Sequence, residues 1–269
     1  MFKENFAIEL LNKETYALEE QVALDVIPSQ NNLYLPKNGE LTIEMKMMPK
    51  LKYENTIISY YCYVNANSEI FDGYFKFTLI RENILVFQIY YENKDITKSV
   101  HTINLCDSKW HHVAVSLKNT DIIIYVDGQE CESCKINFNN ESFKVRDIHN
   151  SASSILRIGA SVYMNHPCYF GQLDEIRIWN CVRNNKEICE FMNETLEDKT
   201  KRLLGYWNFD DKNTKDLSGF SNNLRIAGKE YNMSYVPVSS FKNFTTSKAC
   251  YDVKHITSRL IKSLLTCSK

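Results

Sequence analysis

The sequence of 269 residues lacks net charge and lacks any long apolar run. Its 32 Lys and Arg residues and 33 Asp and Glu residues leave a formal net charge of −1. Because no overall field draws such a chain toward nucleic acid or an anionic membrane surface, we predict neither as a partner. The longest apolar runs, such as residues 121–126, have the length of a strand. They fall far short of the ~20 residues that a bilayer span needs, so we predict no transmembrane segment.

Several enzyme motifs are also missing. The six histidines include no His-Glu-x-x-His, and no glycines are spaced closely enough for a nucleotide or phosphate loop. The neighbours His111 and His112 face apart on an alternating strand, so they are not expected to share a ligand. A serine or cysteine nucleophile that meets a distant histidine only in the fold stays open. We therefore predict that the chain is not an enzyme.

Cysteines are numerous, but their spacing forms no recognisable site. Nine cysteines are odd in number for a fully paired secreted protein, so at least one thiol is expected to stay free or to pair between chains. Cys131 and Cys134 form a lone Cys-x-x-Cys, whereas a structural zinc site needs a second pair or added histidines. On one strand these two cysteines would face opposite sides about 10 Å apart, too far for a disulfide. Cys250 and Cys267 flank a predicted helix that separates them by roughly 25 Å.

The N-terminus lacks the pattern of a secretory signal. Its first fourteen residues carry scattered acids where such a signal has an uninterrupted apolar stretch. The chain therefore either lacks a conventional export signal or begins after processing, and Met1 favours the first interpretation.

The sequence does contain the periodicity of strands. With 44% hydrophobic residues it can bury one large core or two small ones. Apolar and polar residues alternate in short segments separated by turn signals such as Asp127-Gly128, and no βαβ pattern appears. The sequence therefore predicts a mainly β, antiparallel two-sheet sandwich. The strand-like segments are residues 41–47, 74–79, 85–91, 112–117, 122–126, 155–159, 173–179 and 204–209.

Two helical patterns interrupt the strands. Residues 186–196 carry apolar side chains at helical spacing, and Asp252–Leu265 carries an amphipathic stripe. The terminal stripe could meet a partner or lie on a membrane surface, but docking on the sandwich is the expected use. The stretch Lys229–Lys248, rich in Ser, Asn, Thr and Tyr, is typical of a connector. We expect one domain over residues 1–228 and a C-terminal extension over residues 229–269.

A series of short motifs runs in order along most of the chain. They are Asn32-Leu-Tyr-Leu-Pro36, Leu41-Thr-Ile-Glu-Met45, Trp110-His-His-Val-Ala-Val115, Ile124-Tyr-Val-Asp-Gly128, Leu156-Arg-Ile-Gly159, Phe170-Gly-Gln-Leu-Asp-Glu-Ile-Arg-Ile-Trp179, Leu204-Gly-Tyr-Trp-Asn-Phe209 and Asp216-Leu-Ser-Gly219. By the order and intervals of these motifs, the segment from about Val22 to Gly228 resembles the laminin G-like branch, which includes the pentraxins, of the concanavalin A-like lectin/glucanase superfamily. The resemblance implies a jelly-roll sandwich.

The resemblance also raises the questions of hydrolysis and calcium. In the glucanase branch the acids come from a Glu-x-Asp-x-x-Glu strand, and no Glu-x-Asp occurs here. Pentraxin-like relatives hold calcium between an Asp/Asn loop and a later Glu-Gln-Asp loop. The stretch Asn65-Ala-Asn-Ser-Glu69 is similar to the first loop. The stretch Ala160–His166, at the place of the second loop, has no carboxylate. We expect no cofactor, and the favoured interpretation of Asp210, Asp211 and Asp216 is a solvated acidic turn. The alternative is a structural calcium held by these carboxylates and by backbone carbonyls.

Some motif residues have physical roles that do not need the family. Trp110 is expected to open a strand and to bury its ring in the sandwich. Gly171 suits a place where the backbone bends or passes close to a neighbour. Asp174 and Glu175, adjacent on a strand, are expected to face apart and to serve as a turn or capping feature.

Recognition by such a sandwich usually involves its loops. A sugar site needs an aromatic platform with fixed donors and acceptors around it. Residues 60–67 and 163–169 supply both kinds of group, although tyrosine-rich strands also fill ordinary sandwiches. The predicted ligand-binding residues are Asn65, Asn67, Glu69, Tyr163, Asn165 and His166.

Three functions are compatible with these observations. The favoured one is a non-catalytic recognition module for a glycan or a cell-surface protein, extracellular or at the cell surface, as part of a secreted or toxin-like system; cytoplasmic production with release by another route is an alternative. The second is a structural or assembly protein, a homo-oligomer linked by disulfides or by the terminal helix, without a small ligand. A glycoside hydrolase of concanavalin-like fold is the least favoured.

Overall fold

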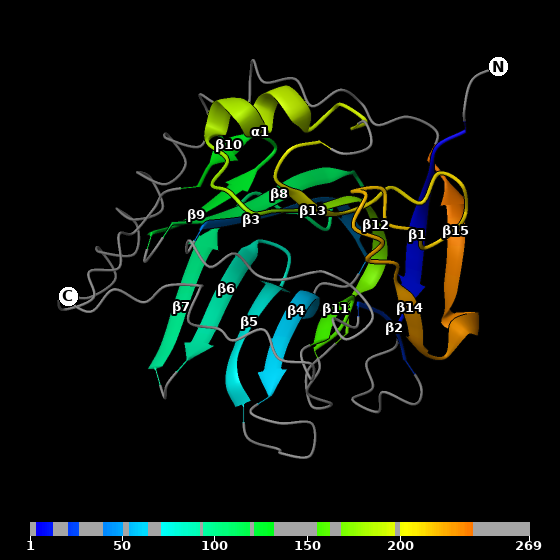
Figure 1. Cartoon of the computed structure of the whole chain (residues 1–269), viewed down its shortest axis with the longest axis horizontal. Helices are drawn as coiled ribbons and strands as arrows, with labels where there is room; N and C mark the ends of the chain where they lie inside the picture. Colours follow the sequence, from blue (N-terminus) through cyan, green and yellow to red (C-terminus); the bar gives the residue numbers. More distant parts are fainter. Residues whose placement is uncertain are drawn as a thin grey trace, which may run out of the picture.

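The computed structural model describes residues 4–12, 21–26, 40–50, 54–63, 71–91, 94–118, 121–131, 155–161, 168–196 and 200–238. These residues form two antiparallel sheets stacked as a sandwich, with one short helix over one of them (Figure 1). The mainly β, two-sheet fold predicted from the alternation and from the resemblance is therefore confirmed. Across the described ranges, no helix has the length and apolar character that a bilayer crossing requires.

Sheet A has the strand order β10-β9-β8-β3-β12-β1-β15 within the described residues, and β13 pairs with β12 off this path. Helix α1 (Asn185–Phe191) lies over its outer face (Figure 1). The strands are β1 (Phe6–Leu11), β3 (Glu40–Pro49), β8 (His111–Lys118), β9 (Asp121–Val126), β10 (Gln129–Glu130), β12 (Phe170–Trp179), β13 (Leu203–Trp207) and β15 (Met233–Pro237).

Sheet B has the order β14-β2-β11-β4-β5-β6-β7 in the same part of the chain. Its strands are β2 (Val22–Val26), β4 (Asn55–Tyr63), β5 (Phe71–Ile80), β6 (Ile84–Tyr91), β7 (Lys94–His101), β11 (Ile155–Ile158) and β14 (Arg225–Gly228). A 3-10 turn, η3 (Glu230–Asn232), joins β14 to β15 and so leads the chain from sheet B to sheet A.

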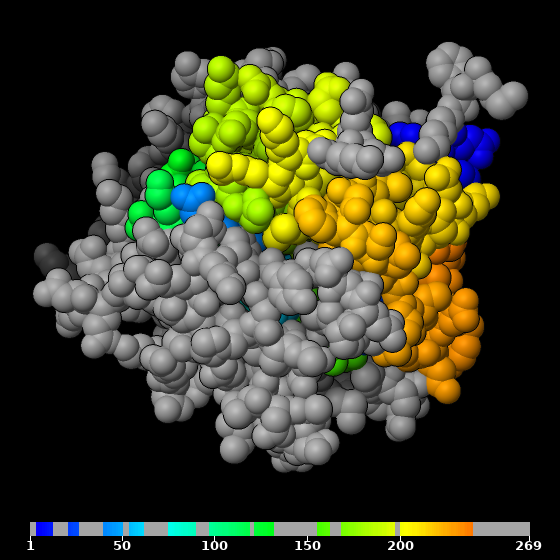
Figure 2. Space-filling model, viewed as in Figure 1, coloured from blue at the N-terminus to red at the C-terminus, as the bar shows by residue number. Residues whose placement is uncertain are grey.

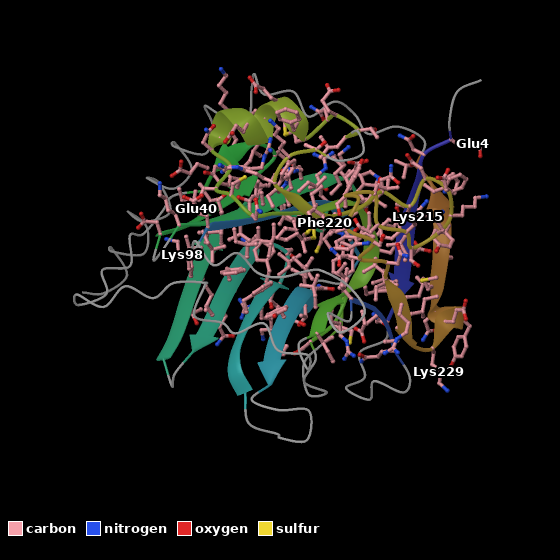
Figure 3. The ribbon with its side chains drawn as sticks, viewed as in Figure 1. Glu4, Glu40, Lys98, Lys215, Phe220 and Lys229 are labelled. Atoms are coloured by element: carbon pink, nitrogen blue, oxygen red, sulfur yellow. The ribbon has the colours of Figure 1, made fainter. Side chains whose placement is uncertain are left out.

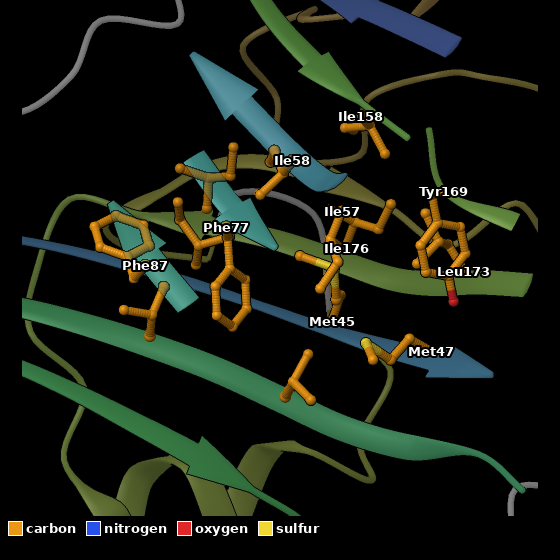
Figure 4. Close-up of a cluster of buried hydrophobic side chains, with 14 of the residues drawn as sticks. Met45, Met47, Ile57, Ile58, Phe77, Phe87, Ile158, Tyr169, Leu173 and Ile176 are labelled. Carbon is orange, nitrogen blue, oxygen red and sulfur yellow. The ribbon is translucent and has the colours of Figure 1, made fainter. Parts of the chain in front are cut away.

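The core lies between the sheets and follows the predicted alternation. Met45 and Met47 of β3 face Ile58 and Phe77 of sheet B across the interlayer (Figure 4). The rings of Tyr60 and Phe75 stack with centroids 5.6 Å apart on the sheet B side. Each such side chain contributes about 1.5–3 kcal/mol by leaving water, so this layer is the main source of stability. Side chains also fill the space between sheet A and α1 (Figure 3), and α1 with the segment after it forms the surface at the top of Figure 2.

Two local predictions are confirmed. Asp127 and Gly128 have φ of 49° and 75°, the left-handed pair of a tight two-residue hairpin turn between β9 and β10. Helix α1 falls inside the predicted segment 186–196, apart from its first residue, but ends earlier, at Phe191. A capping box sets its start, because Asn184 Oδ1 accepts from Glu187 N at 3.1 Å and Glu187 Oε2 accepts from Asn184 N at 2.8 Å.

Two other expectations are wrong. Strand β8 begins at His111, and Trp110 is only half-buried outside the core, whereas Trp179 and Trp207 are the buried indoles. The stretch predicted as a connector contains strand β15, which pairs with β1 along Phe6–Leu10 and completes an edge of sheet A. The predicted terminal helix, Asp252–Leu265, lies outside the described residues.

The expectation for Gly171 is confirmed. This residue of β12 has φ of 148°, and a Cβ placed on it would collide with Met48 O and lie 2.8 Å from Pro49 Cα. Both neighbours are backbone atoms of β3, so they cannot swing aside as a side chain would.

Substituting Gly171 by alanine is therefore expected to destabilise the fold by about 1–3 kcal/mol, through strain at a backbone conformation that L side chains rarely adopt. Urea unfolding of Gly171→Ala and of wild type measures the difference. Ala227→Gly, on the edge strand β14, is the matched control. A Gly171→Ala protein as stable as wild type would show that β3 can move away from β12.

Candidate functional site

The predicted ligand-binding residues belong to two segments, 64–70 and 162–167, that lie outside the described residues. Described residues close to the start of each of the two segments are in contact. Tyr61 lies in β4 two residues before its end at Tyr63, and Ser161 is the last described residue before the second segment. The hydroxyl oxygens of Tyr61 and Ser161 are 3.0 Å apart. The two segments therefore start from one place in the fold, on the outer face of sheet B.

A turn at Gly159 brings Ser161 to this place. Gly159 has φ of 85°, so the chain leaving β11 turns back over the sheet instead of continuing as a strand. Ser59 Oγ then donates to Ala160 O at 2.9 Å. A Cβ on Gly159 would also collide with Leu10, so the turn and the close packing both need glycine.

A buried ion pair lies beside this contact. Arg157 Nε and Nη2 donate to the two carboxylate oxygens of Asp25 at 2.7 and 2.8 Å, which is the bidentate geometry of a strong pair. Arg157 and Asp25 are 7% and 3% exposed. We call Asp25, Ser59, Tyr61, Arg157 and Ser161 the β4–β11 floor. Its one cation and its one anion neutralise each other, and its hydroxyl groups are buried and bond within the protein, so the floor carries no net charge.

Sequence reasoning did not find this floor. Arg157 stands between Leu156 and Ile158, and the alternation of that strand was a usable signal that the arginine faces away from the core. Its partner could not be found in this way, because Asp25 is 132 residues away in the sequence.

The predicted calcium ligands have other partners in the structure. Asp216 is buried and accepts hydrogen bonds from Tyr206 N, Ser218 N and Oγ, and Asn222 N at 2.8–3.0 Å. Asp210 accepts from Phe6 N at 3.2 Å. Within the ranges that the structure describes, no three His, Cys, Asp or Glu side chains are placed to hold a metal ion. Asp216 thus braces the loop after β13, and the calcium at Asp210, Asp211 and Asp216 stays a prediction.

The outer face of sheet A carries a second cluster, which is ionic. Glu44 of β3 accepts from Trp179 Nε1 at 2.8 Å, and His112 Nε2 lies 3.3 Å from its other oxygen. Arg177 Nη1 lies 3.6 Å from the first oxygen. Burial alone would raise the pKa of Glu44, but His112 and Arg177 outweigh it and lower this pKa to about 2. Glu44 is therefore a buried, ionised carboxylate.

Arg177 joins this cluster to helix α1. Its guanidinium donates to Phe191 O at 2.8 Å, at the end of α1, and also to Glu194 O and to the Glu175 carboxylate. Tyr206 OH donates to Glu175 at 3.0 Å. The segment that follows α1 thus covers the cluster from outside, and the carbonyls at the helix end receive a cation.

The expectation that Asp174 and Glu175 face apart is wrong, because β12 bulges there. Lys46 of β3 pairs with Asp174 and Glu44 with Arg177, so three steps along β12 match two along β3. The bulge residue Glu175 has φ of 51°. Because Leu173 and Ile176 both face the core, the two acids between them lie on the outer face.

Burial controls the chemistry of this acid pair. Asp174 is 1% exposed, and burial together with the neighbouring Glu175 raises the pKa of Asp174 well above its usual value. Glu175 is 6% exposed and is engaged by Arg177 and Tyr206. Both carboxylates are therefore buried, and Glu175 is linked to the end of α1 through Arg177.

The structure describes the side chains of Cys106, Cys131, Cys168, Cys181 and Cys189, and no two of these form a disulfide bond within the chain. Burial raises the pKa of the Cys131 and Cys168 thiols to about 12, so neither is a reactive thiolate at neutral pH. The expectation that Cys131 and Cys134 face opposite sides of one strand is not tested, because Cys134 lies outside the described residues.

Comparison with known proteins gives the family. The profile of the concanavalin A-like lectin/glucanases superfamily, of laminin G type, matches residues 25–189. The chain belongs to this superfamily, and the resemblance drawn from its motifs is confirmed. No curated protein sequence matches the chain.

Solved structures share the fold at low sequence identity. A Bacteroides ovatus protein described as a candidate carbohydrate-binding protein is 15% identical with a TM-score of 0.56; the match covers 89% of this chain and 61% of that protein. The heptameric SAP-like pentraxin of Limulus polyphemus is 14% identical with a TM-score of 0.48, over 70% of this chain and 82% of the pentraxin. Domains LG4–5 of the mouse laminin alpha1 chain are 17% identical with a TM-score of 0.46, over 66% and 43%. The chain spans less than two thirds of the length of the Bacteroides protein.

Proposed function

We propose that the protein is a non-catalytic glycan-binding module that acts outside the cell. The ligand would be held above the β4–β11 floor by Asn65, Asn67, Glu69, Tyr163, Asn165 and His166. The observation that carries the proposal is the contact between Tyr61 and Ser161, because it brings the starting points of both predicted segments together. Membership of a lectin and glucanase superfamily and the likeness to the Bacteroides protein support the same function.

The neutrality of the floor is compatible with an uncharged sugar. Its ion pair leaves no net charge, and its buried hydroxyl groups already bond within the protein, so direct contacts to a sugar would come from the six predicted residues. Hydrolysis is not favoured, because the sequence has no Glu-x-Asp and the acids of β12 are buried.

A glycan array with purified wild type is expected to show binding to one sugar group. Asn67→Ala and Tyr163→Ala are each expected to weaken it about tenfold, or about 1.4 kcal/mol, by removing a donor or a stacking ring. Titration calorimetry on the best sugar measures the change.

Tyr231→Ala and Asn213→Ala are matched controls, because both residues are exposed and belong to the segment after β13. They are expected to bind like wild type. Absence of any sugar on the array, or equal binding by all four variants, would contradict the proposal. Turnover of a glucan by the wild-type protein would contradict its non-catalytic part.

A further inference from the structure

His111 lies between two carboxylates that come from different parts of the chain. Its Nδ1 is 2.9 Å from Asp127 Oδ2, in the β9–β10 turn, and its Nε2 is 3.1 Å from Asp107 Oδ1, in the segment that joins β7 to β8. The imidazole is 6% exposed, while the two carboxylates are 17% and 24% exposed. Water and protons therefore reach the cluster from the carboxylate side.

This geometry fixes the protonation state of the ring. An ionised carboxylate only accepts hydrogen bonds, and a neutral imidazole has one N–H and one lone pair. A neutral His111 would satisfy one aspartate and turn a lone pair toward the other. Both contacts are hydrogen bonds only when both nitrogens carry protons, so the arrangement requires the imidazolium ion.

Lys109 and the backbone N–H of His112 also bind the two aspartates, and His111 lies between them. Lys109 N and Nζ donate to Asp107 at 3.0 and 2.7 Å, and His112 N donates to Asp127 Oδ1 at 2.9 Å. Opposite His111 on β3 stands the apolar Met47. On the side of the turn, Cys131 interacts electrostatically with Asp127 and with Glu130. Burial alone would lower the pKa of His111, but Asp127 and Asp107 outweigh it and raise this pKa.

The two aspartates belong to parts that the fold holds together here. The segment of Asp107 leads from sheet B to sheet A, and Asp127 opens the turn whose Gly128 O accepts from Asn185 and from Cys189 Sγ of α1. The cluster therefore connects the link between the sheets to the hairpin that supports α1.

We propose that Asp107, His111 and Asp127 form a proton-dependent clamp that holds the β7–β8 link against the β9–β10 turn and opens when His111 loses a proton. The direction of the pH dependence follows because His111 is easier to protonate in the folded state than in the unfolded state. The clamp contributes its full stability below the unfolded pKa of about 6.5 and loses it as pH rises through the higher folded pKa. Asp107 is the contact that is lost, because Asp127 keeps its backbone bonds to His112.

The proposal is tested by following His111 by NMR during a pH titration of the full-length protein. Wild-type His111 is expected to carry protons on both nitrogens at pH 6.5 and to titrate above that pH. Asp107→Asn supplies an amide N–H that a neutral imidazole can accept, so this variant is expected to titrate at lower pH and to lose the decline of Tm at alkaline pH. Protection of the Lys109 amide from hydrogen exchange is expected to fall in wild type as His111 deprotonates, and to persist in Asp107→Asn.

Asp121→Asn is the matched control, because this exposed acid lies on β9 away from the cluster, and its titration curve is expected to overlay that of wild type. His111→Gln is expected to remove the alkaline decline of Tm altogether. Titration of wild-type His111 at or below pH 6.5, or identical titrations of wild type and Asp107→Asn, would overturn the clamp.

Discussion

Replacing Arg177 with methionine is expected to lower the free energy of unfolding by about 3–5 kcal/mol, the cost of removing one partner from a buried ionic group. The guanidinium is 1% exposed and serves Glu44, Glu175 and the carbonyl groups of Phe191 and Glu194 at once. Methionine fills similar space but leaves two carboxylates without their cation and the end of α1 without its donor. Urea unfolding at pH 7, followed by tryptophan fluorescence, measures the loss, because Trp179 borders the cluster.

Two further variants show whether the loss comes from the cluster. Lys186→Met makes the same kind of change on α1, where the lysine side chain is 85% exposed, and is expected to alter stability by less than about 0.5 kcal/mol. Arg177→Lys keeps the charge but loses the planar fork, so it is expected to recover only part of the stability. A loss below about 1 kcal/mol for Arg177→Met would mean that water or a rearranged α1 replaces the arginine.

Acidification is expected to weaken the fold through Glu44. The pKa of this carboxyl is about 2 in the folded protein, against 4.5 for an ordinary glutamate. A folded-state pKa below the unfolded value stabilises the protein above the unfolded pKa, and this stability is lost as pH falls from 4.5 toward 2. The shift corresponds to about 3 kcal/mol.

The difference in unfolding free energy between wild type and Glu44→Gln isolates this contribution, and it is expected to be largest above pH 5 and to shrink between pH 4.5 and 2. The comparison also cancels the opposite effect of Asp174, whose raised pKa favours the fold at low pH. Glu40→Gln, at the start of the same strand and 4.0 Å from Lys118, is the matched control, for which a small and nearly constant difference is expected. A constant difference for Glu44→Gln down to pH 2 would show that Glu44 is not ionised when buried.

The sequence predicted those strands in which apolar and polar residues alternate within the strand itself. Leu41, Ile43, Met45 and Met47 alternate with polar residues because every second side chain enters the core, and all four are buried. The strands β1 and β15 were not predicted from the sequence, and the reason is physical. Each is short, and they are paired with each other across more than 220 residues of sequence, so the information that makes them strands is not local.

The candidate site was less predictable than the fold. The residue types of segments 64–70 and 162–167 predicted a sugar site in loops, but the β4–β11 floor comes from contacts between distant residues, such as Tyr61 with Ser161. The bulge at Asp174 could not be predicted from the sequence for a similar reason. Alternation assumes a regular strand, and only the pairing of β12 with β3 shows that one residue is extra.

The bulge has a consequence for how the sequence can vary. Loss of either Asp174 or Glu175 would restore two-residue periodicity and leave Ile176 and Ile178 in the core and Arg177 on the outer face, because the pairs Leu173–Met47 and Arg177–Glu44 would then stand in regular register. Over evolutionary time this stretch can therefore lose one of its two adjacent acids without any change of length in β3. A homologue one residue shorter here is expected to have a regular β12 and a β3 of the same length.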